Sequence, residues 1–205
     1  MKRTIILLLA AAIAAAPAGA LLPSFGVKGG VNMANYSGSD GGGDLKLGAV
    51  GGAFLTLDLI AVKIQPELLY SQKGAKEEGT IDFGGTLYPY KMTAKVDYLE
   101  VPVLLKYSFG AIVVPSVYFG PSFGILMSAK GDMAINGVSA SADIKDAYNG
   151  TDIGLVIGAE VKTPVKLSIE ARYTMGLTNA PKALSGYQPD AKNSTISVML
   201  GYYLF

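Results

Sequence analysis

The sequence contains no cysteine, no histidine and no tryptophan. Without cysteine the chain has no disulfide framework, no thiol chemistry and no lipid attached at a signal-peptide cysteine. Without histidine, Ser-His and Asp-His hydrolase mechanisms are excluded, and so are metal sites built from His and Cys. Neither Gly-x-x-x-x-Gly-Lys-Ser/Thr nor Gly-x-Gly-x-x-Gly occurs, so nucleotide binding has no support. We therefore expect a protein that is not an enzyme and that holds no cofactor or metal.

Charged residues are scarce as well, at 16% of the chain, and neither sign dominates. The sequence has 17 Lys+Arg against 16 Asp+Glu, and removing the two basic residues at its start leaves 15 against 16. A nucleic-acid surface needs a basic excess, so we expect no nucleic-acid partner. With 26 Gly, 12 Tyr and 50% hydrophobic residues, the composition is not that of a disordered protein.

Residues 1–20 have the layout of a secretory signal. Lys2 and Arg3 precede an unbroken apolar run, which small residues follow up to Ala20. The run is too short to span a bilayer, so a cleavable signal peptide is favoured over a retained anchor helix. Cleavage after Ala20 would leave residues 21–205 as one domain.

Apolar and polar residues alternate with a period of two in most of residues 21–205, which is the pattern of β-strands with two different faces. The last such segment is apolar on both faces, so its register stays undecided. The eight segments lie roughly at residues 25–33, 45–57, 62–71, 99–107, 117–128, 152–162, 165–174 and 193–205.

One stretch allows a second interpretation. Residues 107–129 carry no charge and are long enough to cross a bilayer as a helix. However, Pro115 and Pro121 lie within this stretch, among β-branched and aromatic residues. These residues favour a strand, a turn and a second strand.

The connections between the segments alternate in length. Long polar loops are expected at roughly 35–44, 74–90, 130–150 and 178–193, and short turns at roughly 58–61, 109–115 and 162–165. Long loops at one end and tight turns at the other are typical of an up-and-down transmembrane barrel. We therefore predict an all-β, eight-stranded antiparallel barrel with both termini at the periplasmic end.

The two faces of the strands differ in bulk, which bears on the orientation of the barrel. A lipocalin-like soluble barrel would have an apolar interior and a polar exterior. Here glycine shares a face with the charged residues, as a narrow lumen requires, and the bulky aliphatic face would meet lipid. Four outward aromatic residues are expected near the periplasmic ends of strands, as a candidate aromatic girdle: Phe25, Tyr107, Phe119 and Phe205.

Six charged residues at inward positions on four segments form a candidate network within the lumen. They are Lys28, Glu67, Glu100, Lys106, Glu170 and Arg172. One interpretation is a charged lining that selects small solutes. The favoured interpretation is a plug of ion pairs, because eight strands leave no continuous channel once side chains are packed.

Several motifs resemble those of a known family. They are GVKGGVN at 26–32, QPELLYSQKG at 65–74, YLEVPVLLKY at 98–107 and YFGP at 118–121. Together with a terminal aromatic residue, they resemble the small outer-membrane barrels abundant in Bacteroidetes, often called porin-family or PorT-like and similar in plan to the eight-stranded OmpX barrel. This resemblance implies a fold and a membrane but little about activity. The barrel-assembly signal usually has Gly five residues before the terminal aromatic, whereas here Leu200 holds that place and Gly201 is one position away.

The sequence thus predicts a non-enzymatic integral barrel of the bacterial outer membrane, with a filled lumen and a structural or interaction role. A narrow pore for small solutes and a secretion-machinery barrel of the PorT type are the alternatives. The expected partners are outer-membrane lipid, the barrel-assembly machinery and a protein bound through the extracellular loops. A monomer is expected.

Overall fold

The computed structural model describes residues 21–59, 61–183 and 186–204. The predicted signal peptide at residues 1–20 lies outside the described residues. So does Phe205, one of the four candidates for the aromatic girdle.

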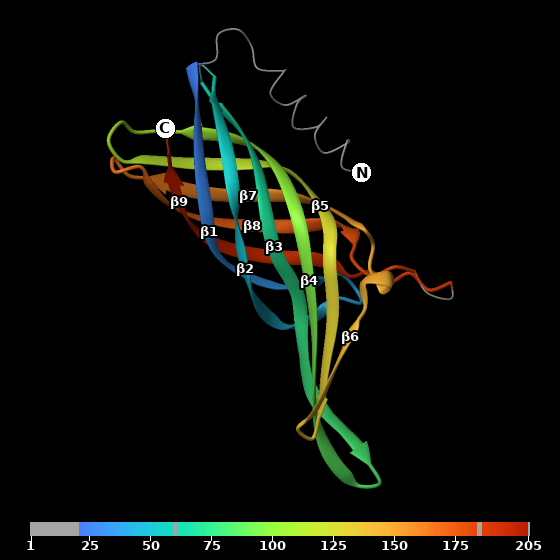
Figure 1. Ribbon diagram of the computed structural model, residues 1–205. Coiled ribbons are helices and arrows are strands. Elements are labelled where there is room, and N and C mark those ends of the chain that lie inside the picture. The colour runs from blue at the N-terminus through green and yellow to red at the C-terminus, as the bar shows by residue number, and fades with distance from the viewer. Residues whose placement is uncertain (1–20, 60, 184–185, 205) are drawn as a thin grey trace.

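The described chain is a closed antiparallel barrel (Figure 1). Its strands are β1 (Leu21–Ser37), β2 (Gly42–Asp58), β3 (Lys63–Phe83), β4 (Thr86–Ser108), β5 (Val114–Ile135), β6 (Val138–Asp143), β7 (Thr151–Lys162), β8 (Leu167–Asn179) and β9 (Lys192–Tyr203), with a 3₁₀ turn, η1 (Lys145–Ala147), before β7. Each barrel strand pairs with the next, β5 pairs with β7, and β9 closes the ring on β1. β6 pairs with β5 outside the ring. The predicted eight-stranded up-and-down barrel is confirmed.

The uncharged stretch at residues 107–129 forms strands and a turn. It contains the end of β4, a turn with Gly110 at φ +95°, and most of β5. In the part of the chain that the structure describes, no helix is long and apolar enough to cross a membrane.

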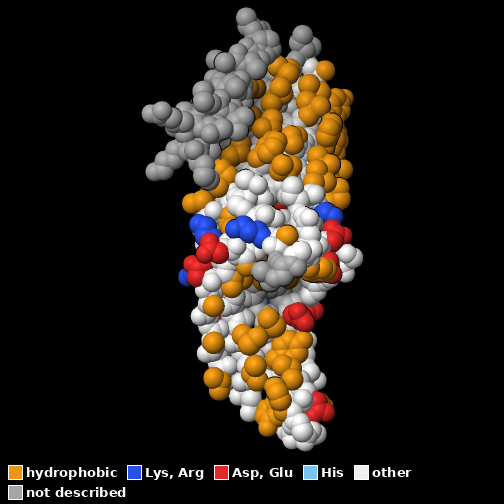
Figure 2. All heavy atoms as spheres, turned by 90° about the vertical axis from the view of Figure 1, so that its right-hand side faces the viewer, with side chains coloured by type: hydrophobic (Ala, Val, Ile, Leu, Met, Phe, Trp, Pro, Cys, Tyr) orange, Lys and Arg blue, Asp and Glu red, His pale blue; other side chains and the backbone are white. Residues whose placement is uncertain are grey.

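Side chains of the barrel strands alternate between the lumen and the outer surface. On β8, Ser168, Glu170 and Arg172 are buried, whereas Leu167 and Ile169 are 51% and 54% exposed. Hydrophobic side chains cover the barrel half of the face in Figure 2. On β8 the outward apolar positions run over residues 167–177, which matches the span of about 9–11 residues that a tilted strand needs to cross a bilayer.

The two neighbours of β9 fix its register, which the sequence leaves undecided. Gly201 lies opposite Lys28 on β1 and opposite Ser168 on β8, and it is buried toward the lumen. Leu200 consequently faces outward and is exposed. The shifted glycine of the terminal strand therefore lies on the inner face, where there is little room for a side chain.

The short turns are where the sequence predicts them, between β2 and β3, at residues 109–113 and at residues 163–166. The start of β1 and the end of β9 lie beside them. We call this side of the barrel the short-turn end and the opposite side the loop end. The connection predicted as a long loop at 35–44 is in fact confined to residues 38–41.

Two of the predicted long loops are wrong. Residues 74–90 belong to a hairpin in which β3 and β4 continue beyond the barrel and turn at Gly84 and Gly85, both with positive φ. Within 130–150, β5 continues and returns as β6 through Asn136 and Gly137, also with positive φ. Adjacent residues with positive φ form the tight turns that join hairpin strands. Residues 74–90 and 130–143 therefore lie mostly in strands, and only residues 144–150 of the second segment, which include η1, form a connection as predicted.

We call residues 75–96 and 129–143 the sheet extension. Its four strands run away from the loop end of the barrel toward the bottom of Figure 1.

Candidate functional site

The central group of lumen charges joins strands from opposite sides of the barrel. Lys28 on β1 donates to Glu67 on β3 (2.8 Å) and to Glu170 on β8 (2.7 Å). Arg172 on β8 contacts the other oxygens of the same two carboxylates, at 2.8 Å and 2.5 Å. Each cation therefore contacts both anions, in a closed set of four ion pairs. The side chains of Glu67 and Arg172 are 0% and 3% exposed, so this set is shielded from bulk solvent.

A second set lies nearer the short-turn end, which we call the short-turn group. Lys106 on β4 donates to Glu160 on β7 at 2.7 Å and to the hydroxyl of Tyr203 on β9 at 3.0 Å. Tyr203 in turn donates to Glu160 at 2.8 Å. Gln65 accepts from Lys106 and donates to Glu67, so it connects the short-turn group to the central group. In both groups direct contacts link the charges.

The third set, the loop-end group, lies on the other side of the central group. Lys73 on β3 pairs with Glu100 on β4 and, at 3.2 Å, with Asp152 on β7. The Lys73 ammonium also lies 5.5 Å from the ring of Tyr98, within the range of a cation–π contact. Three separate sets of ion pairs thus follow one another along the lumen.

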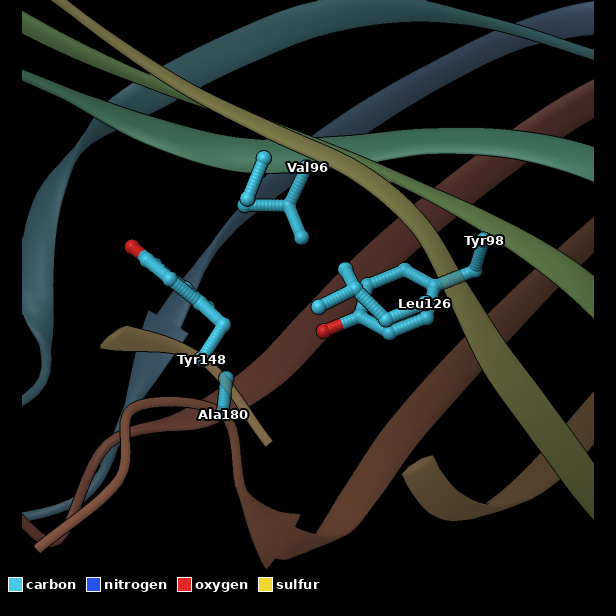
Figure 3. Packing of buried hydrophobic residues seen from close by; sticks show 6 residues of the cluster. Val96, Tyr98, Leu126, Tyr148 and Ala180 are labelled. Atoms are coloured by element: carbon cyan, nitrogen blue, oxygen red, sulfur yellow. The ribbon is translucent and has the colours of Figure 1, made fainter. Parts of the chain in front are cut away.

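An apolar cluster covers the loop-end group. It consists of Val96, Tyr98, Leu126, Ala129, Tyr148 and Ala180, all buried. Figure 3 shows that these side chains come from separate segments and surround one interior space. The connections that follow β6 and β8 contribute Tyr148 and Ala180, so two chain segments fold over the mouth of the barrel.

The six predicted lumen residues do not all join directly. The structure brings Lys28, Glu67, Glu170 and Arg172 together and connects Lys106 to them through Gln65, but it places Glu100 in the loop-end group. Three further residues complete these groups: Lys73, Asp152 and Glu160. Asp152 and Glu160 occupy inward positions in the alternating segment 152–162, so the sequence does carry a signal for them. Lys73 lies beyond the predicted end of its strand.

The described girdle candidates lie near the short-turn end. Tyr107 and Phe119 are 53% and 60% exposed on the outer surface, and Phe25 is half-buried near the start of β1. The ring of Phe109, which was not among the candidates, lies 6.2 Å from that of Tyr107. Phe109 lies in a turn, so strand alternation could not predict that it faces outward.

Hydrogen bonds join the first and last connections at the loop end. Asp40 accepts from the hydroxyl of Tyr187 and, at 2.8 Å, from the backbone N–H of Asp190. Asp190 accepts from the backbone N–H of Ser39 at 3.2 Å. The hydrogen bond from Tyr187 holds the pKa of the Asp40 carboxyl below its ordinary value. We call these contacts the loop clasp. Among the described residues, no group of acidic side chains is arranged to hold a metal ion.

The comparisons with known proteins agree with a barrel. Residues 22–181 match the family model described as outer membrane protein beta-barrel domain. A search of curated proteins finds no match.

Similar solved structures include three bacterial proteins. Ail, the attachment invasion locus protein of Yersinia pestis, has a TM-score of 0.44 at 13% identity, over 90% of this chain and 100% of that one. A major outer membrane protein from Thermus thermophilus has a TM-score of 0.47 at 12% identity, over 90% and 100% of the two chains. Neisserial surface protein A has a TM-score of 0.43 at 13% identity, over 89% and 99%.

Proposed function

The chain belongs to the outer membrane protein beta-barrel domain family and lies in the bacterial outer membrane, and from this premise we propose that it is a non-enzymatic barrel with a closed lumen and an interaction role. In this proposal the apolar band of the barrel meets lipid, and the loop end faces the outside of the cell. The barrel anchors the sheet extension, which is available to a partner there. Phe25, Tyr107, Phe119 and Phe205 would form the aromatic girdle at the inner interface.

The observation that carries the closed lumen is the central group. Lys28, Glu67, Glu170 and Arg172 form four ion pairs across the lumen and are shielded from solvent. A pore for small solutes needs hydrated charges along a continuous path, whereas these side chains occupy the path. Bulky neighbours such as Phe54 and Tyr118 are buried beside them. Charges that cannot face lipid are thereby paired within the barrel.

The proposal includes the processing and assembly of the chain. Residues 1–20 would be a cleaved signal peptide, and residues 21–205 would be the domain that the barrel-assembly machinery inserts as a monomer. The motifs at 65–74 and 98–107 support the proposed relation to the PorT-like, OmpX-like barrels of Bacteroidetes. A docking role in secretion is the second candidate function, and the sheet extension favours it because it offers a surface outside the lipid.

Planar-bilayer recording tests the closed lumen. The mature barrel, refolded and inserted, is expected to give no steady conductance. Glu67→Lys is the informative variant, because it reverses one charge in the central group, and Glu78→Lys on the extension is its control. A reproducible wild-type channel whose cation preference reverses with Glu67→Lys but not with Glu78→Lys would replace this proposal with the pore.

A further inference from the structure

The apolar face of the sheet changes sides where the strands leave the barrel. On β4, even-numbered residues face inward along the whole strand, so Leu99 and Val101 form part of the outer apolar face. Further along β4, outward positions carry Lys95 and other polar residues, and the inward positions carry apolar Met92 and Ala94. Water therefore surrounds the outer face of the extension, and its inner face is apolar but not covered by lipid.

This inner face lines a groove of about 830 Å³ above the barrel mouth. The rest of the lining comes from the end of the β1–β2 connection, the start of β2 at Gly42 and Gly43, and the side chains of Tyr36, Ile144 and Tyr148. The groove is open because many of its lining side chains are small, namely those of Ala75, Ala94, Gly131, Ala140 and Ala142. Met92 and Met133 lie directly opposite each other in the β4–β5 pairing. Methionine side chains adapt readily to different apolar partners. Hydrophobic side chains are visible over the extension in Figure 2.

The two edges of the sheet extension differ. Among the described strands, β6 pairs only with β5, and the pairing of β2 with β3 ends at Lys76. The free edge of β3 carries Glu77, Glu78 and Asp82, and such charges normally protect an edge from additional strands. The edge of β6 consists of Val, Ser and Ala up to Asp143, all exposed. β6 thus offers unprotected backbone donors and acceptors alongside the apolar groove.

The charges of the groove favour a basic occupant. Asp40 and Glu77 line it, and Glu77 accepts a hydrogen bond from Tyr90. Strand alternation places Lys76 and Asp132 on the opposite face, where Asp132 pairs with an outer lysine. Lys76 and Asp132 nevertheless border the groove, so its lining has three carboxylates, Asp40, Glu77 and Asp132, against one cation, Lys76.

We propose that the groove binds an extended polypeptide segment of another protein, apolar at alternate residues and carrying Lys or Arg, which adds as a strand to β6. This inference rests on the proposed interaction role and names the chemistry of the partner. Backbone hydrogen bonds to β6 would supply affinity, and the side chains over Ala140 and Ala142 would supply selectivity.

A second copy of this chain does not fit the groove. Two barrels in one membrane are related by a two-fold axis along the membrane normal. The extension runs away from the barrel, so its strands lie roughly along this axis (Figure 1). A two-fold rotation about the axis therefore leaves the two β6 strands parallel, and the inner face of one extension points opposite to the inner face of the other. The two grooves would then lie on opposite faces of the joined sheet, and neither copy would fill the other.

The test uses the whole mature barrel in detergent micelles and a dye-labelled synthetic peptide of alternating valine and threonine with lysine at both ends. Fluorescence anisotropy is expected to show saturable binding. Methylation of alternate backbone nitrogens removes the donors of one peptide edge and should weaken binding about tenfold. Replacing the terminal lysines by glutamate should weaken binding as well. Equal binding of the methylated peptide would refute strand addition.

Matched protein variants locate the site. Ala140→Lys points a cation into the groove and should abolish binding, whereas Ser139→Lys, on the other face of β6, should not. Glu77→Gln should weaken binding of the basic peptide, and Glu78→Gln should leave it unchanged. Since the chain has no cysteine, Ala142→Cys allows selective disulfide capture of a peptide with one cysteine. Equal effects of the two lysine variants, or full competition by palmitate, would overturn the proposal.

The two proposals fail separately. A wild-type channel in the bilayer recording would refute the closed lumen, regardless of whether the peptide binds. A silent bilayer together with no binding of the peptide would refute the groove site alone. Dimerisation of the barrel that Ala140→Lys abolishes would assign the edge to a second copy and refute the present occupant.

Discussion

Arg172→Ala tests how the lumen charges contribute to stability. In the wild type, two cations and two carboxylates balance, and Arg172 supplies one contact to each carboxylate. After the substitution, Lys28 alone faces Glu67 and Glu170, so the buried group carries one uncompensated negative charge. The Tyr118 ring, whose centroid is 5.6 Å from the guanidinium carbon, also loses its cation.

Breaking a buried pair costs about 3–5 kcal/mol. Arg172→Ala should fall near the lower end, about 3 kcal/mol, because Lys28 still contacts both carboxylates. The double variant Glu170→Gln/Arg172→Met leaves the Lys28–Glu67 pair in a neutral environment and should recover much of that loss. Lys91→Ala, which breaks the half-exposed pair with Glu78, is the control and should cost about 0–1 kcal/mol.

Urea unfolding of the refolded barrel in lipid vesicles gives the free energy of unfolding of all four proteins, followed by circular dichroism. An Arg172→Ala variant within about 0.5 kcal/mol of the wild type would mean that the charges are solvated. That result would contradict the shielded lumen on which the closed barrel depends.

Three other predictions concern lipid contact, packing and pH. Ile169→Arg, on the outer face, should lower the free energy of unfolding in vesicles by about 2–4 kcal/mol. The control Val165→Arg, in a short turn, should lower it by about 0–1 kcal/mol. Equal costs of the two variants would contradict the membrane band. At Gly30 an added Cβ would lie 2.0 Å from a backbone oxygen of β9, so Gly30→Ala should destabilise the barrel by about 1–3 kcal/mol. An added Cβ at Gly150 would have no atom within 4 Å, so Gly150→Ala should be neutral in the same assay. The pKa of Asp40 is lower in the folded protein than in the unfolded chain. The stability that ionised Asp40 gives to the loop clasp is therefore present above the unfolded-state pKa and is lost as the pH falls through the folded-state pKa. Amide exchange, corrected for its intrinsic pH dependence, should therefore show the connection at 38–41 loosening in acid, and an unchanged acid response in Asp40→Asn would refute this cause.

Strand alternation is a local property, and it determines most of the barrel. In residues 167–174 each side chain faces opposite to the next, so the sequence alone separates Ile169 from Glu170. Six further segments repeat the pattern, and the alternation of tight turns with longer connections indicates the up-and-down order. The inner and outer faces could therefore be predicted without any knowledge of contacts.

Alternation does not determine which inward residues meet across the lumen. That depends on the stagger of the strands in the closed ring, which pairs Lys106 with Glu160 and Lys73 with Glu100 and Asp152. The last strand is apolar on both faces, so only its pairing with β1 and β8 places Gly201 inside.

The sheet extension depends on tertiary structure for a different reason. Lys76, Glu78 and their neighbours have the composition of a loop, and a strand surrounded by water has the same charged outer face. Only the pairing of β3 with β4 and of β5 with β6 distinguishes a loop from a strand here, because any residue type can make these backbone hydrogen bonds and composition therefore does not reveal them. The sequence by itself determined which face meets lipid in every barrel strand except the last, whereas the long-range pairing of strands decided the register of β9, the charge partners and the shape of the surface outside the membrane.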